Sequence, residues 1–455
     1  MIEMNRERAT VLGGGMAGLL AARVLADEYE NVTIIDRDPL DVGESGRRGV
    51  PQGRHAHLLL ARGLLVLDDL FPGFADALVA AGATSGDAVG DARLCFGGHR
   101  FAQAHAGLRM VSVSRPFLEH HVRTRVLSRP NVTVVPPSDI VGLTAADAGT
   151  VTGVHVFRRA DGSVGERLPS DLVVDATGRG SRAPTWLADL GFERPTEERA
   201  GVDVSYSSCN YRLPADALGD DWGCLVAPTR TSPRGAALAR LEHGRWLLTL
   251  VGVDGVRPPT DPAALAIFAR SLPFPDVADA IGAADPIDDP VAYRFPRNVR
   301  RRYERLSRLP AGFVVLGDGV CSFNPIYAQG MTVAALEAVA LRDHLRRHRV
   351  PVPLELQRAV ARVVDTPWEM ALGGDLDFPG AHGRLTRKLR MLGRYLARLH
   401  AAAAHDPSLA AAFMRAAGLM DRPEALMRPS VLFRVLRRST TGDGPTPVPI
   451  GGGRS

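Results

Sequence analysis

The chain has 455 residues, enough for two or three domains, and its 45% hydrophobic and 23% charged residues are ordinary for a globular protein. The net charge of +5 comes from 55 Lys+Arg against 50 Asp+Glu, with both signs interspersed and no basic arm carrying aromatic residues, which argues against a nucleic-acid-binding protein. Four scattered cysteines without metal-ligand spacing argue against a structural zinc site and against a disulfide framework.

The first residues pass directly from polar side chains into an apolar strand, without the apolar core of a signal peptide. No apolar run approaches the ~18 residues that a membrane-spanning helix needs. We therefore expect a cytoplasmic protein.

Residues 9–36 have the pattern strand, glycine turn, helix, strand. Gly13, Gly15 and Gly18 form G-x-G-x-x-G between the first strand and the helix, and Asp36 ends the second strand. These glycines allow a tight turn and a close approach of the backbone to a pyrophosphate, which the helix N-terminus attracts. The acid at Asp36 suits ribose hydroxyls, as in FAD or NAD, better than the ribose phosphate of NADP.

Further strands are predicted at 131–135 and in a hairpin that turns at Asp161 and Gly162. Residues 172–174 form a short apolar run typical of a buried parallel strand. From Gly201 the chain reads as alternating strands without intervening helices, which predicts an antiparallel sheet inserted into the first domain.

A strand over 312–318 restores the parallel-sheet pattern and leads through "NPIYAQG" into a helix from Met331 to Arg347. Beyond Pro353 the chain is predicted to be helical to about Arg438. It includes a stripe formed by Leu385, Leu389, Leu392, Leu396 and Leu399, which we interpret as a helix docked on the core. The tail from 440 to 455 has the composition of a disordered end.

Three segments in order resemble the class A FAD-dependent monooxygenases, a family that includes the aromatic hydroxylases and squalene epoxidase. They are the glycine fingerprint, "DATGRGSR" at 175–182, and the Gly317-Asp318 pair. Residues 47–63, "RRGVPQGRHAHLLLARG", and "VVLGDGVCSFNPIYAQGMT" resemble the polyene epoxidases of polyether-antibiotic biosynthesis in particular. The resemblance covers most of residues 9–350.

The resemblance implies that FAD is bound between the two glycine turns, with Asp318 on the ribitol and the Gly330 turn at the flavin ring. "DATG" departs from the usual D-G, so the contact of Asp175 stays open. The residues implied around FAD are Gly13, Gly15, Met16, Ala17, Gly18, Asp36, Arg37, Arg54, Arg115, Val134, Gly178, Gly317, Asp318, Pro325, Gly330, Met331 and Thr332.

For a lipophilic substrate we name five candidate pocket residues: His57, Tyr206, Tyr211, Phe323 and Tyr327. The pair His55 and His57 lacks a third ligand nearby, so we expect no metal, and the two either line the flavin or are structural.

The expected fold class is α/β: a Rossmann-like FAD-binding domain with an inserted antiparallel β-sheet substrate domain and a C-terminal helical region. The predicted boundaries are 1–190 and 291–350 for the FAD-binding domain, 191–290 for the substrate domain, 351–439 for the helical region and 440–455 for the tail.

The resemblance implies a monooxygenase that epoxidises a lipophilic polyene or polyketide with O2, through a flavin C4a-hydroperoxide. No second G-x-G-x-x-G follows a strand, so NAD(P)H would dock transiently or act through a flavin reductase. Contact with a membrane or a carrier protein is not favoured.

The alternatives left open are a hydroxylase of an aromatic or terpenoid substrate, a prenyl-chain reductase, a halogenase and a non-catalytic flavin carrier. A halogenase needs an active-site lysine, and this chain has none before Lys388.

Overall fold

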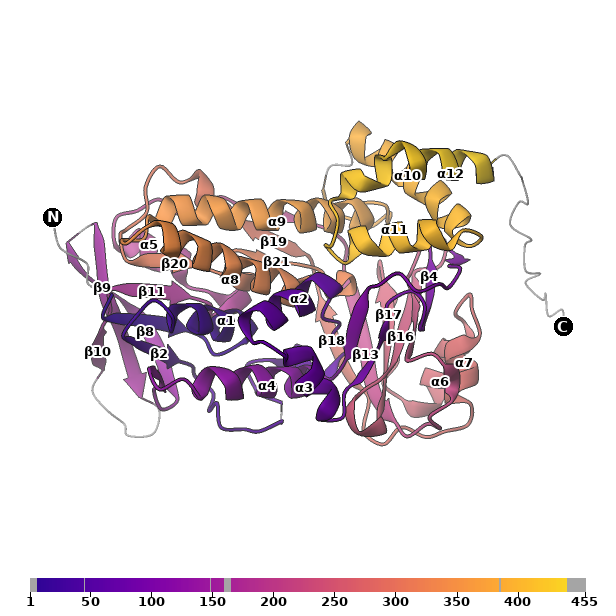
Figure 1. Cartoon of the computed structure of the whole chain (residues 1–455), viewed down its shortest axis with the longest axis horizontal. Coiled ribbons are helices and arrows are strands. Elements are labelled where there is room, and N and C mark those ends of the chain that lie inside the picture. Colours follow the sequence, from indigo (N-terminus) through magenta and orange to yellow (C-terminus); the bar gives the residue numbers. More distant parts are fainter. Residues whose placement is uncertain (1–5, 45, 148, 159–164, 384–385, 440–455) are drawn as a thin grey trace.

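The computed structural model describes residues 6–44, 46–147, 149–158, 165–383 and 386–439. The predicted turn at Asp161 and Gly162, the first leucine of the stripe, Leu385, and the tail lie outside these residues. The described chain combines a parallel sheet, several antiparallel sheets and C-terminal helices, which confirms the expected fold class (Figure 1).

Five parallel strands form the sheet that carries the first glycine turn. In spatial order they are β20 (Phe313–Val315), β11 (Leu172–Asp175), β1 (Arg8–Leu12), β2 (Asn31–Ile35) and β7 (Val132–Val134). The central strands β11 and β1 are buried except at Arg8, as strands covered on both faces of a parallel sheet should be. The predicted strands at both ends of the chain therefore belong to one sheet.

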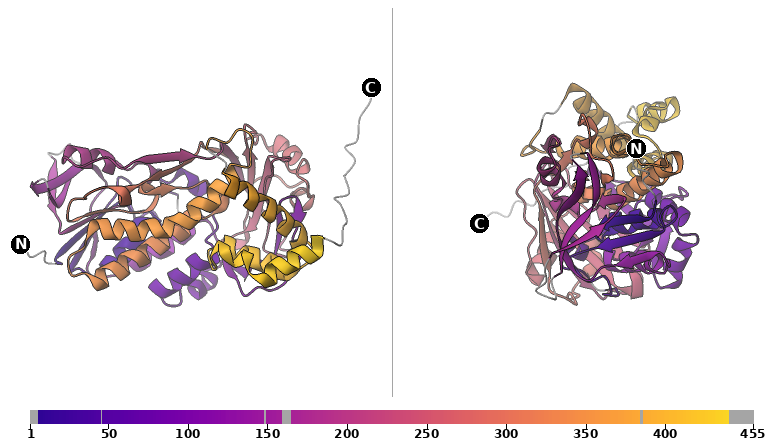
Figure 2. Two further views of the ribbon diagram at one scale, coloured as in Figure 1. Left: turned by 90° about the horizontal axis from the view of Figure 1, so that it is seen from above. Right: turned by 90° about the vertical axis from the view of Figure 1, so that its left-hand side faces the viewer.

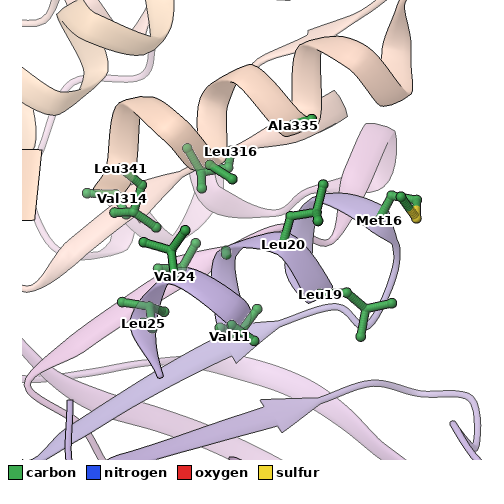
Figure 3. Close-up of a cluster of buried hydrophobic side chains, with 14 of the residues drawn as sticks. Val11, Met16, Leu19, Leu20, Val24, Leu25, Val314, Leu316, Ala335 and Leu341 are labelled. Carbon is green, nitrogen blue, oxygen red and sulfur yellow. The ribbon is translucent and has the colours of Figure 1, made fainter. Parts of the chain in front are cut away.

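Long helices cover this sheet. Helices α1 (Met16–Leu25) and α8 (Gly330–Arg347) pack side by side, and α9 (Pro353–Asp375) packs along α8 (Figure 2). Leu20 and Val24 of α1 belong to the apolar cluster that contains Leu316 and Ala335, so residues far apart in sequence share one core (Figure 3). Helix α4 (Arg115–Leu127) packs on α1.

A seven-stranded sheet forms the second layer of the molecule. Its order is β18 (Val291–Phe295), β13 (Val204–Tyr211), β17 (Trp246–Val253), β16 (Arg234–Arg240), β15 (Gly223–Val226), β4 (Ala92–Phe96) and β5 (His99–Arg100). The pairs are antiparallel except for β15 and β4. The predicted antiparallel strands are confirmed, and β4 and β5 join them from the N-terminal part of the chain.

The expectation of strands without helices after Gly201 is wrong for residues 262–281. Helices α6 (Pro262–Arg270) and α7 (Asp276–Ile281) bury Leu265 and Val277 in the cluster that also contains Leu248 and Leu250 of β17. Asp261 caps α6 by accepting the N–H of Ala264, a local signal that the strand pattern hid.

Smaller elements complete the described chain. One antiparallel sheet contains β8 (Ser138–Asp147), β9 (Thr150–Arg158) and β10 (Glu166–Pro169), and a second contains β12 (Glu197–Ala200), β19 (Asn298–Arg301) and β21 (Cys321–Ser322). A third antiparallel sheet pairs β3 (Thr84–Asp87) with β6 (Arg109–Ser112). Further α-helices are α2 (Ala61–Leu70), α3 (Phe74–Ala80) and α5 (Ala183–Asp189).

The C-terminal part is helical, as predicted, and comprises α10 (Arg387–Ala403), α11 (Pro407–Ala417) and α12 (Pro429–Ser439). Leu399 of the leucine stripe is fully buried in a cluster with Leu94 and Phe101, so α10 docks beside β4 as expected (Figure 1). Among the described helices, we find none with the length and apolar character needed to cross a bilayer.

Candidate functional site

The first glycine turn leaves an open space at the N-terminus of α1. Gly13 has φ +97°, and a Cβ atom there would lie 2.5 Å from the carbonyl oxygen of Ala176, so only glycine fits. A Cβ atom on Gly15 would meet only the Nη2 atom of Arg47, at 3.8 Å. The turn is therefore tight on its inner side and accessible where a phosphate would approach the helix.

Asp36 and Arg47 fix the outer side of this turn. The Asp36 carboxylate accepts the N–H groups of Gly14 at 2.6 Å and Asp38 at 2.8 Å. Arg47 is buried, donates to the carbonyl oxygen of Gly14 at 3.0 Å, and pairs with Asp36 and Glu119. Asp36 thus holds the turn in the protein, and its contact with a ribose stays a prediction.

The second glycine turn touches the first. Gly317 follows β20, and a Cβ atom on it would lie 2.8 Å from the Cβ of Ala17 in α1. Its backbone N–H donates to the buried carboxyl group of Glu337, at 2.5 Å. The two predicted turns, 300 residues apart, therefore form one continuous surface.

Asp318 lies on this surface without a partner. It has no hydrogen bond or ion pair with any residue of the described ranges and is half-buried. Burial raises the pKa of Asp318, and the positive charges of Arg115, Arg179 and Arg301 oppose that rise. An unpaired carboxylate facing arginines can accept hydrogen bonds from ligand hydroxyl groups.

Helices α1 and α8 begin on the same side of the molecule. Figure 3 shows Met16 to Leu25 running in the same direction as Ala335 to Leu341. Neither helix has a side-chain cap or an acidic residue in its first turn. Helices α2 and α5 share this absence, so α1 and α8 are distinguished by their common direction and by the Gly317-Asp318 turn, which contacts α1 at Ala17 and α8 at Glu337.

These features fit FAD. Free N–H groups at α1 suit the pyrophosphate, and the Asp318 carboxylate suits the ribitol hydroxyls. At α8, a Cβ atom on Gly330 would meet nothing within 4 Å, whereas the Thr332 hydroxyl, which lacks a hydrogen-bond partner in the described chain, lies against Gly63 of α2. The N-terminus of α8 favours negative charge on a ligand beside it.

A buried network holds the loop that leads into α8. The Asp375 carboxylate, at the end of α9, accepts hydrogen bonds from Tyr327 at 2.8 Å, Asn324 at 3.0 Å and Asn298 at 2.7 Å. Burial raises the pKa of Asp375 to about 6. Ala328 in this loop has φ +53°, a conformation that costs energy in a non-glycine residue. The network therefore fixes a loop that would otherwise relax.

One face of the seven-stranded sheet presents polar groups toward this loop. Tyr206 of β13 donates to the side-chain oxygen of Asn324 at 3.4 Å. On the same face the Nδ1 atom of His55 lies 2.8 Å from the hydroxyl of Ser208, which lies 2.6 Å from that of Thr249. Figure 1 shows β13 and β17 alongside the N-terminal ends of the helices.

The remaining predicted residues are placed as follows. His57 is half-buried with Nδ1 2.9 Å from the carbonyl oxygen of His55, and burial, with Arg115 next, lowers the pKa of His57 to about 4. Tyr211 lies on the opposite face of β13, in the cluster under α6 and α7, so the structure does not bring it to Tyr206. Phe323 is buried in the main core.

Several of the residues that the resemblance places around FAD are exposed or are engaged by other protein groups. Arg37, Arg54 and Val134 are exposed. Gly178 follows Asp175, whose buried carboxylate accepts from Thr177 and Ser181 and so belongs to its own turn. The other implied residues, Met16, Pro325 and Met331, lie at the starts of α1, the loop and α8.

The sequence did not single out Arg47, Glu119, Ser208, Thr249, Tyr293, Asn298, Glu337 or Asp375 as site residues. Most of them act through partners far along the chain, for example 153 positions between His55 and Ser208, and Glu337 lies 20 positions from Gly317, so no local spacing identifies them.

Among the described residues, the one group of three His, Cys, Asp or Glu side chains within metal-binding reach is His344, His348 and Glu355. The Nε2 atom of His344 already accepts the N–H of Val352, which gives this residue a role in joining α8 to α9.

No family model matches the chain. Among curated protein sequences it is similar to protein Rv3254 of Mycobacterium tuberculosis (strain ATCC 25618 / H37Rv), with 37% identity over 439 residues, which cover 94% of this chain and 92% of the relative.

Several solved structures share the fold. A flavoprotein/dehydrogenase from Cytophaga hutchinsonii has a TM-score of 0.67 at 14% identity and covers 96% of this chain and 100% of its own. PqsL, a probable FAD-dependent monooxygenase from Pseudomonas aeruginosa, has 0.60 at 16%, covering 90% and 100%. CmlS, a flavin-dependent halogenase, has 0.62 at 17%, covering 92% and 77%. At these identities the likeness establishes the fold.

Proposed function

The chain belongs to the same family as protein Rv3254 and has the fold of FAD-dependent monooxygenases, and on this premise we propose that it is an FAD-dependent monooxygenase acting on a lipophilic alkene. The observation that carries the proposal is the common direction of α1 and α8, together with the unpaired carboxylate of Asp318 in the turn that contacts both helices. This arrangement would offer one extended ligand two helix N-termini and a carboxylate.

Each part of the site has a binding or positioning task. The open N-terminus of α1 would hold the pyrophosphate, and Asp318 would accept from the ribitol. The Gly330 turn would meet the pyrimidine edge of the ring, with Arg115 beside it. Bound FAD, once reduced, would supply the oxygen chemistry. The protein's own contribution is then to orient the substrate and to exclude water.

The face of β13 and β17 is the proposed substrate side. Tyr206, Val204 and Val251 are buried there with Ile326 of the loop and Phe378 after α9. This cluster is mainly apolar with few polar groups, a composition that suits contact with a lipophilic ligand. Among the candidate pocket residues, Tyr206 and Tyr327 fit this location.

Epoxidation is the proposed reaction because the segments 47–63 and "NPIYAQGMT" resemble the polyene epoxidases. Hydroxylation is the second candidate, since PqsL and a p-nitrophenol 4-monooxygenase from Pseudomonas putida share the fold. A halogenase also shares the fold, and the lack of a lysine before Lys388 argues against that activity here.

The test begins with the visible spectrum of the purified protein after incubation with FAD. NADH, NADPH or a flavin reductase is then added with squalene or farnesol, and oxygen uptake and products are measured. We expect a bound flavin and one atom of isotopically labelled O2 in an epoxide. A hydroxylated product selects the second candidate. A saturated product formed without oxygen selects a reductase, and a protein that cannot retain FAD contradicts the proposal. The matched control is Asp318→Ala.

A further inference from the structure

His55 is a buried histidine with one ring nitrogen that no protein group satisfies. Its side chain is 5% exposed, and the Nε2 atom has no hydrogen-bond partner among the described residues. An unsatisfied buried donor or acceptor costs about 1–3 kcal/mol. The position of the ring therefore calls for an explanation beyond packing.

The opposite nitrogen of the ring ends a chain of hydrogen bonds. The Thr249 hydroxyl oxygen accepts the N–H of Ala56 at 2.8 Å and lies 2.6 Å from the Ser208 hydroxyl. The Ser208 hydroxyl in turn lies 2.8 Å from Nδ1 of His55. Each hydroxyl has one proton, so the chain must run in one direction.

One direction of the chain leaves a single group unpaired, the Nε2–H itself, and the other direction leaves two. If Thr249 donates to Ser208 and Ser208 donates to Nδ1, both hydroxyl protons have acceptors. In the reverse direction the Thr249 proton has no acceptor in the described part of the chain, and Nε2 is an unpaired acceptor as well. The first arrangement places the imidazole proton on Nε2. Burial also lowers the pKa of His55 to about 4, so the ring is neutral near pH 7.

The surroundings of His55 place it at the proposed flavin site. A Cβ atom on Gly53 would lie 3.7 Å from Cγ of Arg115. The His55 ring centroid lies 6.0 Å from that of Tyr206, which bonds the loop before α8, and 5.3 Å from that of Tyr293. Tyr293 is half-buried on the edge strand β18.

We propose that His55 is a neutral hydrogen-bond donor, fixed in the Nε2–H form by Ser208 and Thr249, and that it donates to an acceptor oxygen of a ligand held between the sheet and the loop. The inference rests on the proposed function for the location of that ligand. The oxygen belongs either to the flavin or to the substrate, and the chemistry of recognition is the same. A cationic group would be excluded, because the N–H repels it.

The first measurement is made without FAD. Protein containing nitrogen-labelled histidine gives separate NMR signals for protonated and unprotonated ring nitrogens, and His55→Asn identifies the His55 pair among the 13 histidines. Asparagine keeps an amide near the position of Nδ1 and places no atom at Nε2. We expect the Nε2–H form in the wild type and a loss of that preference in Ser208→Ala. A wild-type Nδ1–H form overturns the proposal.

The second measurement identifies the source of the oxygen. FAD is added first, then farnesol, and separately β-farnesene, which has a similar chain without the hydroxyl. A shift of the Nε2–H signal with FAD assigns the flavin. A shift with farnesol and not with β-farnesene assigns the substrate. Equal shifts with both, or none with any of the three, overturn the donor role. The visible spectrum shows whether the wild type retains FAD. If it retains none, the proposed function is contradicted, and the first measurement still decides which ring nitrogen of His55 carries the proton.

Discussion

The buried carboxyl group of Glu337 accepts the backbone N–H of Gly317 at 2.5 Å, joining the middle of α8 to the turn that carries Asp318. Burial raises the pKa of Glu337 from 4.5 to about 8. Glu337 is therefore protonated near pH 7 in the folded protein and ionised in the unfolded chain, so folding takes up a proton between these two values.

The sign of the pH dependence follows from this uptake. Because the native state binds the extra proton, the free energy of unfolding falls as pH rises from about 4.5 to about 8. Glu337→Gln removes this contribution while keeping an oxygen for Gly317. We measure the free energy of unfolding in urea at pH 5.5 and at pH 8.5. Between these pH values it should fall by at least about 1 kcal/mol less in the variant than in the wild type, since one pKa unit corresponds to about 1.4 kcal/mol. The exposed Glu369→Gln is the control, and equal losses in Glu337→Gln and the wild type would refute this role.

Gly13 and Gly15 should respond differently to alanine. Gly13→Ala meets the Ala176 carbonyl oxygen and a positive φ, so we expect a loss of about 1–3 kcal/mol in stability. Gly15→Ala has space in the protein, so its melting temperature should stay near that of the wild type. Because its methyl group would stand where a phosphate approaches, FAD affinity should fall at least about tenfold (~1.4 kcal/mol). Thermal melts and FAD titrations check both, and unchanged affinity in Gly15→Ala would count against the pyrophosphate position.

Asp175 and Asp318, the aspartates of the two other motifs, should also differ in whether their replacement lowers stability or FAD affinity. Asp175 accepts from Thr177 and Ser181 and is fully buried, so Asp175→Ala leaves buried donors unsatisfied and should cost about 2–4 kcal/mol in stability. Asp318 has no partner in the described chain, so Asp318→Ala should fold normally and lose FAD affinity by at least about tenfold (~1.4 kcal/mol). If Asp318→Ala unfolds readily and still binds FAD as the wild type does, our assignment of Asp318 is wrong.

Asp375→Asn tests the network behind the loop. The amide cannot accept at both former oxygens, so at least one of Asn298, Asn324 and Tyr327 loses its acceptor. We expect a loss of about 1–3 kcal/mol in stability and a changed visible spectrum of the bound flavin, because the loop borders its ring in our proposal. Asp377→Asn, exposed two positions away, is the control. An unchanged flavin spectrum in Asp375→Asn would contradict our proposal that the loop held by Asp375 borders the flavin ring.

The sequence predicted those parts of the fold that depend on residues close together in the chain. The Gly13 to Gly18 turn, its strands and the start of α8 are encoded by local spacing, and the structure confirms those elements. The predicted domain boundaries and FAD contacts stay predictions. Helices α6 and α7 were missed because they have only 9 and 6 residues, too few for a helical spacing of apolar residues to stand out between the strands.

The polar site residues could not be found in this way. His55 depends on Ser208 and Thr249, and Asp375 on Asn298 and Asn324, and these partners meet only after the inserted sheet has folded against the loop. The sequence named His57 as a candidate pocket residue and gave His55 no separate role, while the structure places the buried hydrogen-bond chain at His55.

The position of β20 has a consequence for synthesis of the protein. This strand pairs in parallel with β11, yet more than 130 residues separate the two in the chain. Until β20 leaves the ribosome, the nascent polypeptide exposes β11 as an open edge, which invites mispairing with other chains. The same delay applies to Asp318 and α8, which follow β20, so FAD, bound as we propose, would enter only after these segments have been made.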